Sequence, residues 1–291
     1  MSDMLFSLVP VARALFQGVD WELDSSVRLQ NLIMSQRVEI LRLAEELSPK
    51  QLSWMLTHNV AEINEYFVKG GFPEVKLSDA GLDAIYLGSI LKLIAEFIEV
   101  GETGYWIEEI QKPAFRWELA TIYDCNSQLV VSAKTDLGFY LLIANDKLKI
   151  ADEIDLYLHW KNLIACINQP TLLRGGGAKV VNSFSGVVVP GFNVPDMKIE
   201  IIKQLLGLCG DGYVVQEAIL MARASLLPGK IQFEAAAAIS AKRAMMKKKM
   251  APKSTDWVLR GPMTFALMMP GHNAPLAVGR VGVGSMLDDL D

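Results

Sequence analysis

A run of cations near the C-terminus carries the clearest chemistry in this sequence. Between residues 242 and 253 six side chains are cationic and none is acidic: Lys242, Arg243, Lys247, Lys248, Lys249 and Lys253. Ammonium and guanidinium groups at this density attract phosphate oxygens and do not read base identity. The cluster therefore predicts sequence-independent contacts with a nucleic acid backbone. The alternative is a solvated helix end, where Lys and Arg complement the helix dipole.

A glycine-rich loop is expected to contribute to the same contact. Arg174 and Lys179 flank the triplet Gly175–Gly177, and both side chains could approach a phosphate backbone. The loop lacks the Ser or Thr and the spacing of a nucleotide-binding P-loop. The glycines at 279, 282 and 284 have the wrong spacing for a dinucleotide-binding turn. No nucleotide cofactor is predicted.

Other residue types that could catalyse or bind metal are scattered. The three histidines, at 58, 159 and 272, lie in no zinc-binding motif, and the sequence has no nucleophile elbow around a serine. Its three cysteines are odd in number and far apart, which argues against a disulfide framework and favours a reducing compartment. The sequence thus predicts no catalytic residue, no cofactor and no metal site.

Charge and hydropathy point to self-association. Residues 242–291 carry eight basic and four acidic side chains, a net charge of +4, which leaves −9 on residues 1–241. The mean hydropathy of +0.26 is high, yet the most apolar stretch, residues 85–100, is interrupted by charges. Such a stretch cannot span a membrane, and the first 16 residues do not resemble a secretory signal. We expect a cytoplasmic protein, or a virion protein if it is viral, whose surplus apolar surface is buried between subunits.

Most of the chain has features typical of helices. Candidate caps and apolar spacing predict seven or eight helices, including 26–47, 49–69, 78–100, 152–166, 196–208, 213–226 and 230–250. Residues from about 115 to 150 alternate apolar and polar positions between turn signals, which predicts one small antiparallel sheet. The fold class is therefore α+β, predominantly α-helical, with extended N- and C-terminal arms.

Five segments follow from this pattern. They are an apolar N-terminal arm (1–24), a helical subdomain (25–112), a β meander (113–150), a second helical subdomain with the glycine loop (151–250), and a C-terminal arm (251–291). The C-terminal arm is rich in Pro and Gly but also apolar, which indicates that it is covered.

These observations favour a structural, self-assembling protein over an enzyme. The leading interpretation is a viral coat or nucleocapsid-type subunit that forms a homo-oligomer or filament through both arms and packages RNA or another nucleic acid. The alternative is an enzyme whose active site is assembled from dispersed residues. A third interpretation is a protein that acts on membranes through its apolar N-terminal segment.

Overall fold

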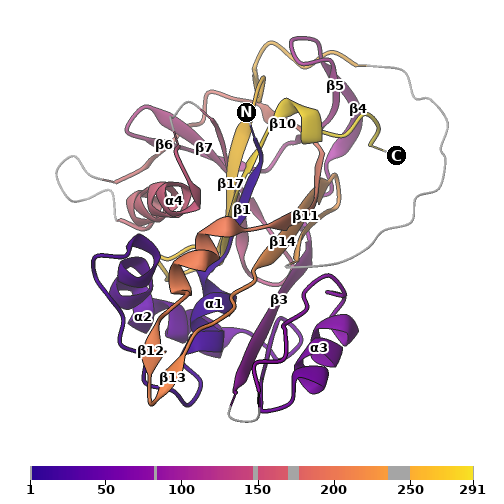
Figure 1. The fold of residues 1–291 in the computed structure, drawn as a ribbon. Coiled ribbons are helices and arrows are strands. Elements are labelled where there is room, and N and C mark those ends of the chain that lie inside the picture. The colour runs from indigo at the N-terminus through magenta and orange to yellow at the C-terminus, as the bar shows by residue number, and fades with distance from the viewer. Residues whose placement is uncertain (1, 82–83, 147–149, 170–176, 235–249, 291) are drawn as a thin grey trace.

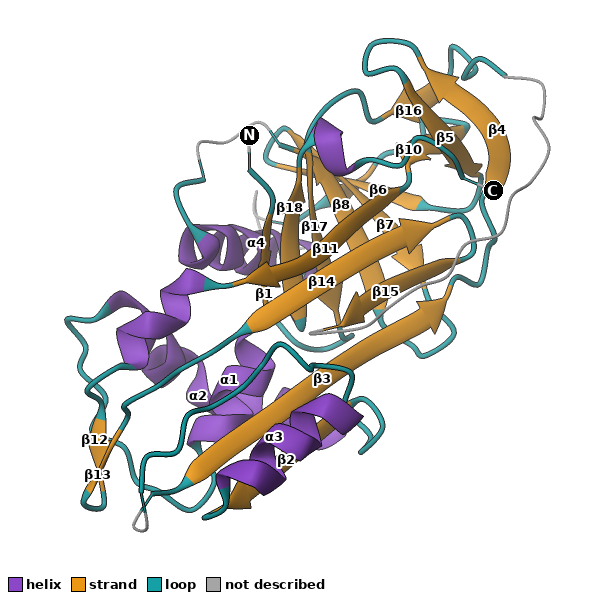
Figure 2. Ribbon diagram, turned by 45° about the vertical axis from the view of Figure 1, so that its right-hand side comes forward, coloured by secondary structure: helices purple, strands orange, loops and turns teal. Residues whose placement is uncertain are grey.

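The protein, seen in a computed structural model, is built mainly from β-strands (Figures 1 and 2). The structure describes residues 2–81, 84–146, 150–169, 177–234 and 250–290. Within these ranges 18 strands form four sheets, and the helices are few. The predicted fold class, predominantly helical with one small sheet, is therefore wrong.

The largest sheet joins the two ends of the chain. Its order is β1 (Met4–Phe6), β18 (Ala277–Val281), β17 (Met263–Met268), β8 (Tyr140–Asn145), β7 (Gln128–Lys134), β6 (Thr121–Cys125) and β9 (Lys179–Val180). Strand β1 pairs antiparallel with β18, so that Leu5 lies opposite Gly279. Both terminal segments thus supply strands to the body of the chain, and the expected extended arms are a second error in the predicted fold class.

A five-stranded antiparallel sheet packs against it. Its order is β11 (Phe192–Lys198), β14 (Met221–Leu227), β15 (Lys230–Glu234), β3 (Tyr86–Glu96) and β2 (Leu52–Thr57). Strands β14 and β15 form a hairpin around Pro228 and Gly229. In β15 the side chains of Ile231 and Phe233 are fully buried, because alternate residues of a strand face the core.

Two smaller sheets complete the β structure. One has the order β16 (Asp256–Val258), β10 (Gly186–Pro190), β5 (Lys112–Trp117) and β4 (Glu102–Ile107), with β10 and β16 parallel. The other is the hairpin of β12 (Cys209–Gly210) and β13 (Tyr213–Val214). The strands expected between 115 and 150 are present, but they are divided between two sheets.

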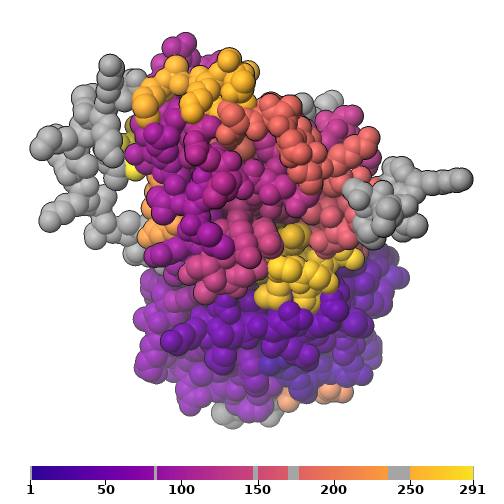
Figure 3. Space-filling model, turned by 180° about the vertical axis from the view of Figure 1, so that it is seen from behind, coloured from indigo at the N-terminus to yellow at the C-terminus, as the bar shows by residue number. Residues whose placement is uncertain are grey.

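Helices cover the sheets. They are α1 (Leu8–Leu15), α2 (Arg28–Glu46), α3 (Val60–Lys69) and α4 (Glu153–Asn168), with short 3-10 turns η1 (Glu200–Leu205) and η2 (Val283–Ser285). Helix α3 lies across the outer face of β2 and β3 (Figure 2). Seen from behind, the N-terminal third forms the lower part of the molecule (Figure 3). None of these helices has the length and apolar character needed to cross a membrane, within the described residues.

Three predicted helices are strands instead. Tyr86–Glu96 is β3, Met221–Leu227 is β14, and the described part of the predicted helix 230–250 begins as β15. In β3 the buried residues Leu91, Leu93 and Ala95 alternate with less buried ones, which is the two-residue period of a sheet. The remainder of the last predicted helix, residues 235–249, lies outside the described residues.

The core lies between the two larger sheets. Phe192 of β11 and Phe265 of β17 stack with ring centroids 5.2 Å apart, and neither ring is exposed. A Cβ on Gly279 would fall 2.1 Å from Phe265, so β18 can approach the ring only because residue 279 is glycine. The position of Phe265 is thus fixed from both sides.

We predict that Phe265→Ala lowers the free energy of unfolding by about 3–5 kcal/mol, since a large buried side chain is lost and a cavity remains. Urea denaturation measures this value. The exposed Leu119 is the control, and Leu119→Ala should change stability by less than about 0.5 kcal/mol. Equal effects of the two variants would contradict the assigned core.

Candidate functional site

The five-stranded sheet contains a gap. Strand β15 separates β14 from β3 only over Lys230–Glu234, opposite Glu96–Lys92 of β3. Below Lys92, β3 continues to Tyr86 and pairs with β2 on its other side. In the described part of the chain no strand pairs with this lower edge of β3 on the side of β14. Six residues of β3, Tyr86–Leu91, therefore have an open edge.

A cavity of about 940 Å³ occupies this gap. One wall is formed by Tyr86–Ser89 of β3 and the opposite wall by Glu217–Met221, which lead into β14. Val11 and Leu15 of α1 also line it. An extended segment that adds to sheet edges gains main-chain hydrogen bonds and places alternate side chains in pockets. The cavity thus has the architecture of a site for one more strand.

Strand β15, which ends where the gap begins, has a buried carboxyl group at its last residue. Glu234 is only 3 % exposed, and Arg223 donates from Nη2 to its Oε2 over 3.4 Å and from Nη1 to Asp196 Oδ2 over 3.0 Å. Burial raises the pKa of Glu234, while nearby Lys92 and Arg223 act to lower it. The end of β15 is thus held by the contact between Glu234 and Arg223, and burial makes this carboxyl group easier to protonate than an exposed glutamate.

The chain after residue 249 is attached to the four-stranded sheet at a second place. The backbone of Met250 bonds to β4 through Gly104 and Trp106. Further along, Asp256 Oδ2 accepts a hydrogen bond from Arg116 Nε at 3.0 Å, and both side chains are buried. Ser185 Oγ donates to the other oxygen of Asp256 at 2.9 Å. Removing Arg116 would leave the Asp256 carboxylate without its counter-ion in the interior, so this end of the segment is firmly fixed to β5 and β10.

The structure gives only part of the predicted nucleic acid site. Lys179 lies in β9 and Lys253 just before β16, and both are exposed. The remaining residues lie outside the described residues, namely Arg174, Lys242, Arg243, Lys247, Lys248 and Lys249. Nucleic acid binding by these residues therefore stays a prediction. Within the described ranges no three His, Cys, Asp or Glu side chains gather as metal ligands would.

Sequence reasoning missed the residues that border the gap and those that anchor the chain after residue 249. Arg116 and Asp256 are 140 positions apart, and no local pattern connects them. A signal did exist for the strands: LKLIAEF and KIQFE both alternate apolar and polar residues. The two-residue alternation in these segments predicts strands that include Lys92 and Glu234.

Comparison with known proteins identifies the fold. No family model matches the chain, and no curated protein sequence matches it either. Solved structures do match over nearly their whole length. "Cleaved Serpin 42Da" has a TM-score of 0.58 at 12% identity and covers 99% of this chain and 93% of its own.

Two further structures agree. Serpin48, described as a highly specific serpin of the insect Tenebrio molitor, has a TM-score of 0.52 at 11% identity and covers 97% of this chain and 92% of its own. Thyroxine-binding globulin in complex with thyroxine has a TM-score of 0.51 at 11% identity, with coverages of 98% and 94%. At such identities the likeness concerns the fold alone. The interpretation as a viral coat or nucleocapsid subunit, with its virion location, is wrong, because the fold is that of serpins.

Proposed function

We propose that this chain is a protease inhibitor of the serpin type, in which a protease cuts within residues 235–249 and the segment after β15 then fills the gap in the five-stranded sheet. Insertion of a reactive loop into a β-sheet is how serpins use this fold, and it releases strain stored in the uncut protein. The resemblance to serpin structures, one of them cleaved, supports the proposal.

The register of β15 carries the argument. Glu234 lies opposite Lys92 of β3 and opposite Arg223 of β14. If β15 were extended in the same register, residues 235–240 would lie opposite 91–86 of β3 and opposite 222–217. These are the residues of the open edge and of the facing cavity wall. The length of the gap thus corresponds to six further residues of β15.

The sequence of the segment suits this strand. Continuing the alternation of Ile231 and Phe233, the core-facing positions would be 235, 237, 239 and 241, which are Ala, Ala, Ile and Ala. The first charged residue at a core-facing position would be Arg243. The AAAA run that favoured a helix is equally a run of small side chains that a narrow gap accepts.

The cations of the segment indicate the kind of protease. Trypsin-like enzymes hold a Lys or Arg side chain in a pocket with an acid at its base. Residues 242–249 offer five such side chains, Lys242, Arg243, Lys247, Lys248 and Lys249. The proposal therefore assigns the cationic cluster to recognition by proteases that cleave after basic residues.

A pair of variants tests insertion. Ala237→Asp would place an unpaired charge at a core-facing position of the inserted strand, whereas Ala236→Asp would place it on the outer face, diagonal to Lys92. After cleavage by trypsin, the thermal midpoint of the wild type and of Ala236→Asp should rise by about 10 °C or more, because several backbone hydrogen bonds are added. Ala237→Asp should show little rise.

Mass spectrometry of the fragments must place the cut within 242–249, and circular dichroism follows the melting. A covalent or otherwise stable complex with the protease should form for the wild type and be reduced for Ala237→Asp, which would be cut as an ordinary substrate. If cleavage at these residues leaves the thermal midpoint of the wild type unchanged, the proposal is wrong.

A pH dependence follows from Glu234. Because burial raises its pKa in the folded protein above the usual value near 4.5, the folded state binds this proton more tightly than the unfolded state. Stability due to this group is therefore present at low pH and is lost as pH rises through the raised pKa. Glu234→Gln should remove this loss.

Urea denaturation of both proteins between pH 4 and 8 measures the effect. The stability of Glu234→Gln relative to wild type should increase with pH above about 4.5 and then level off. Glu108→Gln, at an exposed turn between β4 and β5, is the control and should parallel the wild type. A parallel profile for Glu234→Gln would refute the assignment.

A further inference from the structure

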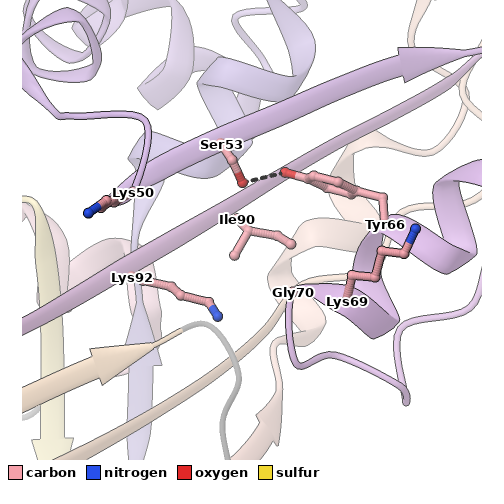
Figure 4. A pocket seen from close by; sticks show the side chains of 7 residues that line it. All are labelled: Lys50, Ser53, Tyr66, Lys69, Gly70, Ile90 and Lys92. Atoms are coloured by element: carbon pink, nitrogen blue, oxygen red, sulfur yellow. Dashed lines mark hydrogen bonds between the residues drawn. The ribbon is translucent and has the colours of Figure 1, made fainter.

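Reactive side chains outside the gap can act together only where they meet. In a hollow of about 270 Å³ between α3 and the five-stranded sheet, Ser53 Oγ and Tyr66 OH are 2.8 Å apart. Figure 4 shows that the ammonium groups of Lys50 and Lys92 do not point toward this pair of hydroxyls. These charges therefore do not converge on one ligand. A pair of cysteines on the large sheet does converge.

Cys125 and Cys166 lie at the contact between β6 and α4. Cys125 is the last residue of β6, and Cys166 lies in the last turn of α4. The helix packs against this part of the sheet (Figure 1). Both cysteines are buried, with exposed fractions of 2 % and 8 %. The fold thus brings together two thiols that are far apart in the sequence.

The backbone fixes this approach. Strands β6 and β9 are antiparallel, and Asp124 lies opposite Lys179. When this register is continued by one residue, Ala178 lies opposite Cys125. The N–H of Ala178 donates to the C=O of Cys166 over 3.0 Å. Both cysteines therefore have Ala178 as a backbone neighbour, which holds the end of α4 beside the end of β6.

The two thiols contact each other. A hydrogen bond joins the side chains of Cys125 and Cys166. Burial, together with this neighbour, raises the pKa of Cys125 to about 12, so that its thiol keeps the proton at neutral pH. Neither residue takes part in the proposed inhibition. The pair is a buried dithiol whose sulfur atoms are already neighbours.

We propose that Cys125 and Cys166 form an oxidation site, which a small-molecule disulfide such as oxidised glutathione converts to an intramolecular disulfide. The sulfur of Cys166, the more exposed residue, would attack one sulfur of the oxidant, and its proton would leave with the first glutathione thiol. The sulfur of Cys125 would then attack the Cys166 sulfur of this mixed disulfide, and its proton would leave with the second thiol. The protein loses two electrons and two protons, and the oxidant becomes two thiols.

The new bond would tie α4 to the large sheet and close a loop that contains β7 and β8. Such a crosslink stabilises a protein mainly because it restricts the unfolded chain. Since both thiols are buried, formation and reduction of the bond are expected to be slow. The site does not depend on the role of residues 235–249.

The full chain with Cys209→Ser tests the site, because this change removes the third, exposed cysteine. The protein is incubated with oxidised glutathione at about pH 8, where thiolates are more abundant, and its thiols are then counted in denaturant. The count should fall from two to none without a glutathione adduct in the intact mass, and peptide mapping should show Cys125 linked to Cys166. The thermal midpoint should rise by about 5 °C or more. Dithiothreitol should reverse both changes.

Cys166→Ser in the same background is the matched control. It retains Cys125 alone, so incubation with oxidised glutathione should produce no crosslink within the chain and no rise in the thermal midpoint. For the Cys209→Ser protein, two thiols that remain free after the incubation, a persistent glutathione adduct, or a link between two chains would overturn the proposal. This result does not require the control to fold.

Discussion

An interior position in a β-sheet must have its backbone groups hydrogen-bonded on both sides, and this demand shapes the molecule. Strand β15 meets the demand over Lys230–Glu234, but the edge of β3 below Lys92 has no neighbouring strand among the described residues. Water can form hydrogen bonds with the backbone groups of such an edge. A neighbouring strand forms better ones, because its N–H and C=O groups are already aligned. The cavity and the contact at Glu234 adjoin this incomplete sheet, and the buried Arg116–Asp256 pair anchors the chain after residue 249 to the four-stranded sheet.

Some of the fold could be predicted from local sequence. The helices expected at 26–47 and 152–166 correspond to α2 and α4, and Asp152 caps α4 by accepting from the backbone of Asp155. Residues 78–100 resemble a helix in sequence, because Lys92, Glu96 and Glu99 are spaced like charges on one face of a helix. The same stretch alternates at period two, and tertiary pairing with β2 and β15 decided between the two periods. The division of the chain at residues 24, 112, 150 and 250 stays a prediction.

The site was beyond sequence reasoning for a different reason. The cationic residues can be identified in the sequence. The function assigned to them, however, depends on strand β15 before them and on the gap beside β3. Glu234 became informative only when the register placed it between Arg223 and Lys92. The nucleic acid interpretation treated charge alone as the signal, and a dense group of cations is compatible with a protease substrate as well as with a phosphate backbone. Self-association and nucleic acid binding stay predictions.

The pairing of β1 with β18 has a consequence for synthesis. Phe6 lies opposite Val278, so the edge of β1 stays uncovered until β18, far along the chain, has been synthesised. Closing so long a loop is entropically costly, and folds dominated by such distant contacts form slowly. During translation the apolar residues 4–15, which are largely buried in the finished protein, have no partner from β17 or β18. A nascent chain of this kind would expose aggregation-prone surface until β17 and β18 have been synthesised, and chaperones would act on it during that interval.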